Sequence, residues 1–312
     1  MSSTLRLLAQ HGRFVLVIGL VAGLALPQVA SAMRPWLGEL VLLLLFLNAF
    51  RVGLPSAMQV FKHAQETLPI IFTYQLVMPL LCLALFLFFG SANSSVAIAL
   101  VLMLSAPPVT GSPNMSIMLG HPPDHAFRLL LLGTLLLPLT LIPIFWLSPE
   151  LGSLITAVKT SLRLGLSICT VVAVAFILRA AFRPQMEMLE LQALDGITSI
   201  TLAIIVIGLM SAVTPALSNE PLQLARWMLV ATGANFGMQI LAYWGQKSFA
   251  LSKNISPNAL VAGNRNIALF LVATNATQSE EFLMFLGCYQ IPMYLTPIIM
   301  RPLLGNRSKP DL

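Results

Sequence analysis

The chain has 312 residues, of which 57% are hydrophobic and only 9% are charged, with a net charge of +6 at neutral pH. About a quarter of the residues in an ordinary soluble domain are charged. This composition therefore excludes a typical soluble protein and predicts a chain whose natural surroundings are lipid.

Long apolar stretches follow one another along the chain, separated by short joints that are polar or contain Pro or Gly. A spanning helix needs about 20 predominantly apolar residues. The predicted spans are 14–32, 36–54, 67–90, 95–118, 125–147, 160–182, 194–216, 224–246, 256–275 and 281–304. A transmembrane β-barrel would need alternating strands of about ten residues, and the unbroken apolar run from Val41 to Leu47 argues against it. We predict an all-α polytopic membrane protein of about ten transmembrane helices.

The first stretch also has the features of a secretory signal peptide. Arg6 and Arg13 precede an apolar run from Phe14 to Leu26, which is followed by the small residues Ala30 to Ala32. We expect this stretch to be retained as the first span.

The basic residues predict the orientation, because short cytoplasmic joints of membrane proteins are enriched in Lys and Arg. With a cytoplasmic N-terminus, that side has Arg6, Arg13, Arg51, Lys62, Arg128, Arg179, Arg183, Lys247, Lys253, Arg301, Arg307 and Lys309. The opposite side has Arg34, Lys159, Arg163 and Arg226. We therefore expect a multi-pass protein of the cell inner (plasma) membrane with both termini in the cytoplasm. Because this topology accounts for the positive charge, we expect no nucleic-acid partner.

The joint between Ser148 and Lys159 divides the chain into two halves of five spans, residues 1–152 and 153–312, which form a single integral membrane unit. An odd number of spans in each half makes the two halves inverted repeats. The fourth span of each half carries helix-breaking residues: three prolines within 105–114, and Gly, Asn and Arg within 256–266.

Unwound backbone at membrane depth is tolerated only where it is buried in protein or lines a watery cavity. Matching breaks in two halves are typical of the binding site of a transporter, whereas two merely kinked helices are the alternative. The predicted substrate-binding residues are Thr110, Ser112, Asn114, Asn264, Arg265 and Asn266.

Three segments resemble the bile acid:sodium symporter family: Thr73-Tyr74-Gln75-Leu76-Val77-Met78-Pro79, the break from Ser105 to Asn114, and Arg265-Asn266. The resemblance covers nearly the whole chain. It implies a core of spans 3–5 and 8–10, with crossing broken helices 4 and 9, which rocks against a panel of spans 1, 2, 6 and 7. Substrate would enter the crevice between them.

By position, the resemblance implies that Gln75 matches a glutamine that helps to hold sodium, and that Asn114 and Asn266 match the asparagines beside the crossing. Other positions depart from the family pattern. The ninth span of the family has a Glu four residues before a Gln-Asn pair, where this chain has Val261 and then Arg265-Asn266. In the fifth span, a Ser and a Thr of the first sodium site are replaced by Arg128 and Leu132.

Sodium prefers several oxygen ligands, and a nearby guanidinium would repel it. We therefore interpret Arg265, together with Arg128, as a replacement for the cation, and we expect no cofactor and no bound metal. The predicted function is alternating-access transport of a small organic anion, bile-acid-like or a carboxylate, without sodium. The alternatives are sodium-coupled symport at a rearranged site that uses Gln75, and a non-transporting membrane sensor that binds a ligand.

An intramembrane enzyme is not expected, because the chain has no His-Glu-x-x-His or Gly-x-Ser-x-Gly motif. Arg265 lies about nine residues from either end of its span, too deep to reach the membrane surface, and no carboxylate is expected at its depth. Arg128 is expected near a span end, where a long basic side chain reaches the headgroups. His121, Asp124 and His125 are expected to be solvated loop residues.

Overall fold

The computed structural model describes residues 5, 7, 12–149, 153–249, 254–272 and 279–306. Arg6, Lys253, Arg307, Lys309, the side chain of Arg13 and the end of the predicted ninth span therefore lie outside the described residues.

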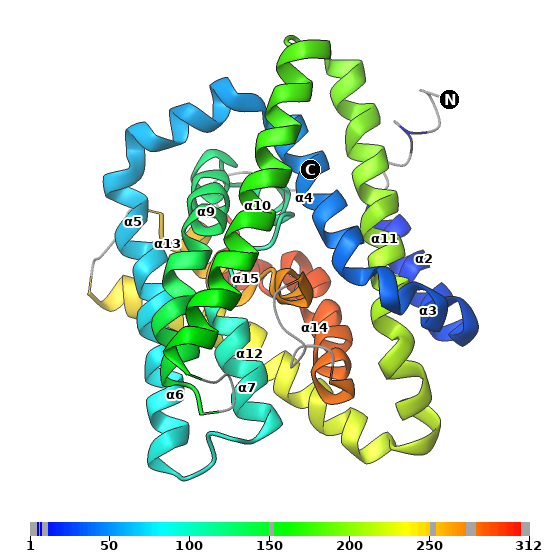
Figure 1. Ribbon diagram of the computed structural model, residues 1–312, viewed down its shortest axis with the longest axis vertical. Coiled ribbons are helices and arrows are strands. Elements are labelled where there is room, and N and C mark those ends of the chain that lie inside the picture. The colour runs from blue at the N-terminus through cyan, green and yellow to red at the C-terminus, as the bar shows by residue number, and fades with distance from the viewer. Residues whose placement is uncertain are drawn as a thin grey trace.

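The described part of the chain is built from helices (Figure 1). Its α-helices are α2 (Gly12–Ala25), α3 (Pro27–Met33), α4 (Leu37–Val60), α5 (Ala64–Phe72), α6 (Met78–Phe88), α7 (Ser95–Ser105), α8 (Ser112–Met118), α9 (Asp124–Leu147), α10 (Leu154–Phe182), α11 (Met188–Asn219), α12 (Pro221–Ser248), α13 (Ile255–Gly263), α14 (Glu280–Ile299) and α15 (Arg301–Leu304). Short 3-10 or π turns join some of them: η1 (Arg34–Trp36), η2 (Phe61–His63), η3 (Thr73–Val77) and η4 (Ile267–Val272).

Six helical stretches of the described residues are long and apolar enough to cross a membrane: Pro27–Val60, Ala64–Phe88, Asp124–Leu147, Leu154–Phe182, Met188–Asn219 and Glu280–Ile299. Large apolar side chains such as Phe88, Leu139 and Ile177 are exposed on their surfaces, as lipid-facing residues would be. The prediction of an all-α, multi-pass membrane protein is confirmed at this level.

The other predicted spans differ in kind. The stretch 14–32 is divided between α2 and α3 at Pro27, and the stretches 95–118 and 256–275 are interrupted. The stretch 224–246 lies within α12, which is a continuous helix but carries the buried amides of Asn235, Gln239 and Gln246. α12 is long enough to cross a membrane, but these polar residues exclude it from the six apolar stretches above.

One group of helices consists of α2, α3, α4, α10 and α11, with α11 packed against α2, α3 and α4. α4 is kinked at Gly53, which has a φ of 70° that only glycine adopts easily, two residues before Pro55. Arg179 of α10 donates to two carbonyls at this kink, those of Phe50 (2.7 Å) and Arg51 (2.8 Å). The kink leads the chain across the molecule to α5 (Figure 1).

The second group surrounds α13, which packs against α9 and α12 (Figure 1). α12 also packs against α14, and α5, η3 and α9 lie side by side. Within this group are the two interrupted helices, α7 followed by α8, and α13 followed by η4.

Candidate functional site

The two interrupted helices end where their sequences prevent continuation. α7 stops at Ser105, because Pro107 and Pro108 supply no N–H donors and force the residue before each into an extended conformation. Ala106 is accordingly extended, with ψ 149°. α13 stops at Gly263, and Asn264 after it is also extended.

The unwound stretches cross and pair as a short antiparallel bridge between Pro108 and Arg265. The backbone bonds run in both directions, from Val109 N–H to the Asn264 carbonyl (2.9 Å) and from Asn266 N–H to the Pro107 carbonyl (2.8 Å). Each break thus satisfies backbone groups that the other exposes, which is a requirement for irregular backbone within a membrane.

Arg265 lies at this crossing and is 2% exposed. Its guanidinium donates to three backbone carbonyls: Nε to Ala262 (3.0 Å), Nη1 to Ala106 (2.9 Å) and Nη2 to Tyr74 (3.3 Å). The guanidinium carbon also lies 5.3 Å from the centre of the Tyr74 ring. Among the described residues, the ion pairs involve other arginines, Arg34, Arg51 and Arg183, so Arg265 is held by dipoles.

Each of these carbonyls has lost its usual helical partner. In the π-helical turn η3 the amide of Met78 donates to the carbonyl of Thr73, five residues earlier. In the same register residue 79 would donate to the carbonyl of Tyr74, but residue 79 is a proline and has no N–H. The carbonyl of Ala106 follows the end of α7. The carbonyl of Ala262 would take the amide of Asn266, which is bonded across the crossing instead.

The position of the charge is electrostatically favourable. Ala106 and Ala262 lie at the C-terminal ends of α7 and α13, where helix dipoles carry partial negative charge. The buried positive charge of Arg265 is therefore stabilised by these helix ends as well as by its three hydrogen bonds.

A buried polar cluster supports the crossing from α12 and α14. Asn235 donates to the carbonyl of Gly263 (2.7 Å) and to Oδ1 of Asn264 (3.2 Å), and Thr296 also donates to Asn264 Oδ1 (3.1 Å). Tyr289 donates its hydroxyl proton to the Gly263 carbonyl and accepts the Arg265 backbone N–H (3.0 Å). The predicted binding residue Asn264 is therefore fully buried and engaged within the protein.

The other predicted binding residues divide into accessible and buried ones. Asn114 is exposed, and Thr110 and Asn266 are half-buried and lie together, with Asn266 Nδ2 3.5 Å from Thr110 Oγ1. Ser112 is fully buried, and its hydroxyl has no partner among the described residues. Of the predicted binding residues, Thr110, Asn114 and Asn266 are thus accessible, and Thr110 and Asn266 lie beside the crossing.

The positions matched to sodium ligands have mixed surroundings. Gln75 is 1% exposed and donates to the Gly133 carbonyl (3.1 Å), while its Oε1 is buried without a partner among the described residues. Val261 and Leu132 belong to an apolar cluster with Leu129 and Tyr74. Val261, Leu132 and Arg128, which stand at expected oxygen-ligand positions, therefore offer sodium no side-chain oxygen.

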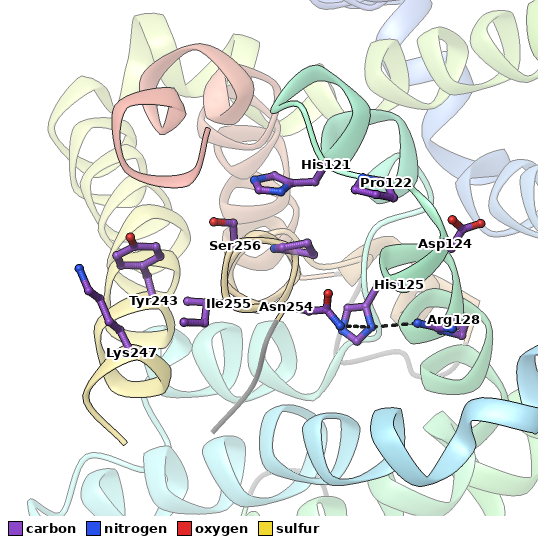
Figure 2. A pocket seen from close by; sticks show the side chains of 11 residues that line it. His121, Pro122, Asp124, His125, Arg128, Tyr243, Lys247, Asn254, Ile255 and Ser256 are labelled. Atoms are coloured by element: carbon purple, nitrogen blue, oxygen red, sulfur yellow. Dashed lines mark hydrogen bonds between the residues drawn. The ribbon is translucent and has the colours of Figure 1, made fainter. Parts of the chain in front are cut away.

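Arg128 lines a separate cavity of about 540 Å³, which we call the Arg128 cavity (Figure 2). Its walls are formed by the start of α9 and the turn before it, the end of α12 and the start of α13. The lining residues are His121, Pro122, Asp124, His125, Arg128, Tyr243, Lys247, Asn254, Ile255, Ser256 and Pro257. His125 is buried, not solvated as expected, because it is bonded to Asn258 of α13.

A chain of buried hydrogen bonds connects this cavity to the crossing. Gln246 Nε2 donates to the Ala242 carbonyl (3.1 Å) and to the Tyr74 hydroxyl (2.8 Å), so Gln246 Oε1 is the acceptor for Asn258 Nδ2 (2.7 Å). Asn258 Oδ1 must then accept from His125 Nε2 (2.6 Å). The ring of His125 therefore carries its proton on Nε2, and Nδ1 is an acceptor.

Several of these residues were not predicted from the sequence, namely Tyr74, Asn235, Gln246, Asn258, Tyr289 and Thr296. A signal was present, since Asn235, Gln239 and Gln246 recur at intervals of four and seven residues and so share one face of an otherwise apolar helix. A polar stripe of this kind within a membrane helix predicts a buried polar partner.

Comparison with known proteins yields no match, either to protein-family profiles or to curated proteins. The likeness to bile acid:sodium symporters accordingly stays a prediction.

Proposed function

We propose that the chain is a secondary transporter that moves a small organic anion across the inner membrane by alternating access, with ten spans arranged as two inverted five-helix repeats. The observation that carries this proposal is the crossing, where two interrupted helices pair and the guanidinium of Arg265 binds three freed carbonyls. Irregular backbone of this kind is typical of the central site of a transporter.

Arg265 is the fixed counterpart of a coupling cation in this proposal. Its charge is buried and permanent, and its ligands come from α7, α13 and η3. Sodium shifts the equilibrium of a symporter because it binds one state better than another. A charge that never leaves cannot supply this coupling, so we infer transport that does not depend on sodium.

The substrate would contact the accessible side of the crossing, at Thr110, Asn114 and Asn266. Because the guanidinium of Arg265 points toward carbonyls, the substrate would be held by amide and hydroxyl hydrogen bonds, with the buried charge attracting it from behind. This arrangement favours an anion with an apolar body, bile-acid-like or a simpler carboxylate.

The second candidate is sodium-coupled symport at a rearranged site, and Gln75 favours it. Gln75 Oε1 is a buried amide oxygen without a partner among the described residues, close to Gly133 and Pro108 at the crossing. An oxygen of this kind is a suitable sodium ligand, and further ligands would have to come from backbone carbonyls.

Uptake of labelled organic anions into proteoliposomes, with sodium or choline outside, separates the two candidates. We expect equal uptake in both salts for the unmodified protein and for Arg163→Gln, which removes an exposed arginine of α10. Arg265→Gln should abolish uptake. Uptake that requires sodium in the unmodified protein would refute the built-in cation, and anion binding without any uptake would favour a sensor.

A gain of function gives a sharper test. The double substitution Val261→Glu with Arg265→Gln restores the residues that the family resemblance implies for a sodium site. The new carboxylate would lie next to Ala262 in the space between α13 and α9. We expect uptake by this variant to become dependent on sodium, whereas uptake that stays indifferent to sodium would contradict the equivalence of Arg265 and the ion.

A further inference from the structure

The Arg128 cavity lies outside the crossing and has features that the proposed transport does not use. Figure 2 places Arg128 and Asp124 on one side of the group and Tyr243 and Lys247 on the other, with His121, His125 and Asn254 between them. Its volume, about 540 Å³, is ample for a small oxyanion or a lipid headgroup.

Positive charge and unused donors converge on this cavity. Arg128 makes one weak bond, from Nη2 to His125 Nδ1 (3.4 Å), and its buried Nε has no partner among the described residues. Lys247 is exposed at the opposite wall, above the rings of Trp244 (5.0 Å) and Tyr243 (5.8 Å). An unpaired buried N–H of a charged group is costly, and a turn of the Arg128 side chain toward an oxyanion in the cavity would satisfy it.

Two helices also begin at the cavity, α9 at Asp124 and α13 at Ile255. In the described part of the chain, neither N-cap residue, Pro123 of α9 or Asn254 of α13, caps its helix with a side-chain hydrogen bond. Helix N-termini add partial positive charge to that of Arg128 and Lys247. The carboxylate of Asp124 is exposed and drawn at the outer edge of the group in Figure 2.

His125 links anion binding to protonation. Its Nδ1 accepts from Arg128 Nη2 and from Asn254 Nδ2 (3.2 Å). A proton on Nδ1 would therefore face two donors, so protonation of His125 requires Arg128 to turn away from the ring. An anion in the cavity would give the turned Arg128 a new hydrogen-bond partner. The charged groups near the ring are Arg128 and Asp124 of α9, His121 of the preceding turn, Lys247 of α12 and Glu66 of α5.

We propose that the Arg128 cavity is an oxyanion site, in which Arg128 and Lys247 bind a sulfate- or phosphate-like group while His125 takes up a proton on Nδ1. The proton comes from the surrounding water and forms the new N–H bond, so one positive charge is added beside the anion. Binding at this site does not require transport to be measured, so it can be tested in the purified protein.

The oxyanion has two possible sources, a free anion or the phosphate of an anionic lipid. Leu241 and Trp244 of α12, and Phe249 directly after it, are exposed near the cavity wall formed by Tyr243 and Lys247, which fits a position next to lipid. Both sources share the chemistry of a tetrahedral oxyanion, so they are separated by experiment.

Sulfate is the suitable probe, because its charge does not change between about pH 5.5 and pH 8, the range in which histidine titrates. We expect calorimetric titration of the protein in a neutral detergent, at constant ionic strength, to show saturable binding that tightens as the pH falls. Titration in two buffers of different protonation enthalpy should show net proton uptake near pH 7. Absence of saturable binding would overturn the proposal.

Variants assign the roles. Arg128→Gln should weaken sulfate binding by about tenfold or more, whereas Arg163→Gln should not change it. His125→Gln, which keeps a donor for Asn258, should still bind sulfate but without proton uptake. Unchanged affinity in Arg128→Gln, or retained proton uptake in His125→Gln, would refute the assignment. If Arg128→Gln does not fold, Lys247→Gln at the exposed wall should weaken binding by roughly threefold, and an unchanged affinity would again refute it.

The same titration in lipid nanodiscs identifies the source. Weaker sulfate binding in phosphatidylglycerol than in phosphatidylcholine would show that a lipid phosphate competes for the site. Equal binding in both lipids would assign the site to a free oxyanion.

Discussion

Two arginines of this chain lie in opposite kinds of surroundings. Arg265 is buried, and its three nitrogens donate to carbonyls of α13, α7 and η3. Arg128 is half-buried at the Arg128 cavity, where it makes one weak bond and keeps a buried Nε without a partner among the described residues. The comparison separates a charge that belongs to the architecture from a charge that is free to meet a ligand.

The difference arises from the backbone, not from the side chains themselves. Carbonyls that lose their helical partners can hold a guanidinium. In this chain such carbonyls arise where Pro79 follows η3, where Pro107 follows α7 and where α13 ends. The start of α9 and the start of α13 expose amides instead, which bind anions rather than cations. Arg128 therefore adds to an existing positive field, whereas Arg265 neutralises a negative one.

The largest effect is expected from Arg265→Gln. The substitution leaves buried carbonyls unsatisfied, each at about 1–3 kcal/mol, and removes the charge at two helix ends. We expect the thermal unfolding midpoint in detergent to fall by roughly 10 °C. A midpoint equal to that of Arg163→Gln would show that the crossing does not depend on the guanidinium.

The packing of α13 on α12 gives the next largest effect. A Cβ added at Gly263 of α13 would lie 2.1 Å from the backbone oxygen of Asn235 in α12. A Cβ added at Gly237, which also belongs to α12, would meet nothing within 4 Å. Gly263→Ala should destabilise the protein by about 1–3 kcal/mol, and Gly237→Ala should be neutral or slightly stabilising. Equal unfolding midpoints for both variants would contradict the close approach of the helices.

The smallest effect is expected from Arg128→Gln on stability. The single weak bond of Arg128 to His125 and its partial exposure predict a change in the free energy of unfolding within about 1 kcal/mol, although oxyanion binding should weaken by about tenfold or more. Unfolding is measured without added oxyanion and in a neutral detergent. A destabilisation as large as that of Arg265→Gln would show that Arg128 is also structural.

The sequence predicted the two breaks correctly because prolines and a mid-span Gly-Asn-Arg run are local signals. The helix α7 ends at Ser105 and α13 ends at Gly263, within the predicted segments. Arg265 is buried between the two breaks, and among the described residues its guanidinium donates to backbone carbonyls. The sequence could not show that Asn264 turns inward to Asn235 and Thr296, because those residues are distant along the chain.

The sequence by itself determined that the chain is helical and membrane-spanning, because these properties depend on composition and on local helix-breaking residues. Only the tertiary structure decided which carbonyls receive Arg265 and which tautomer His125 adopts. Those choices depend on hydrogen bonds between α9, α12 and α13 and between α7, η3 and α13. Pairings across such separations follow from packing, and no local pattern encodes them.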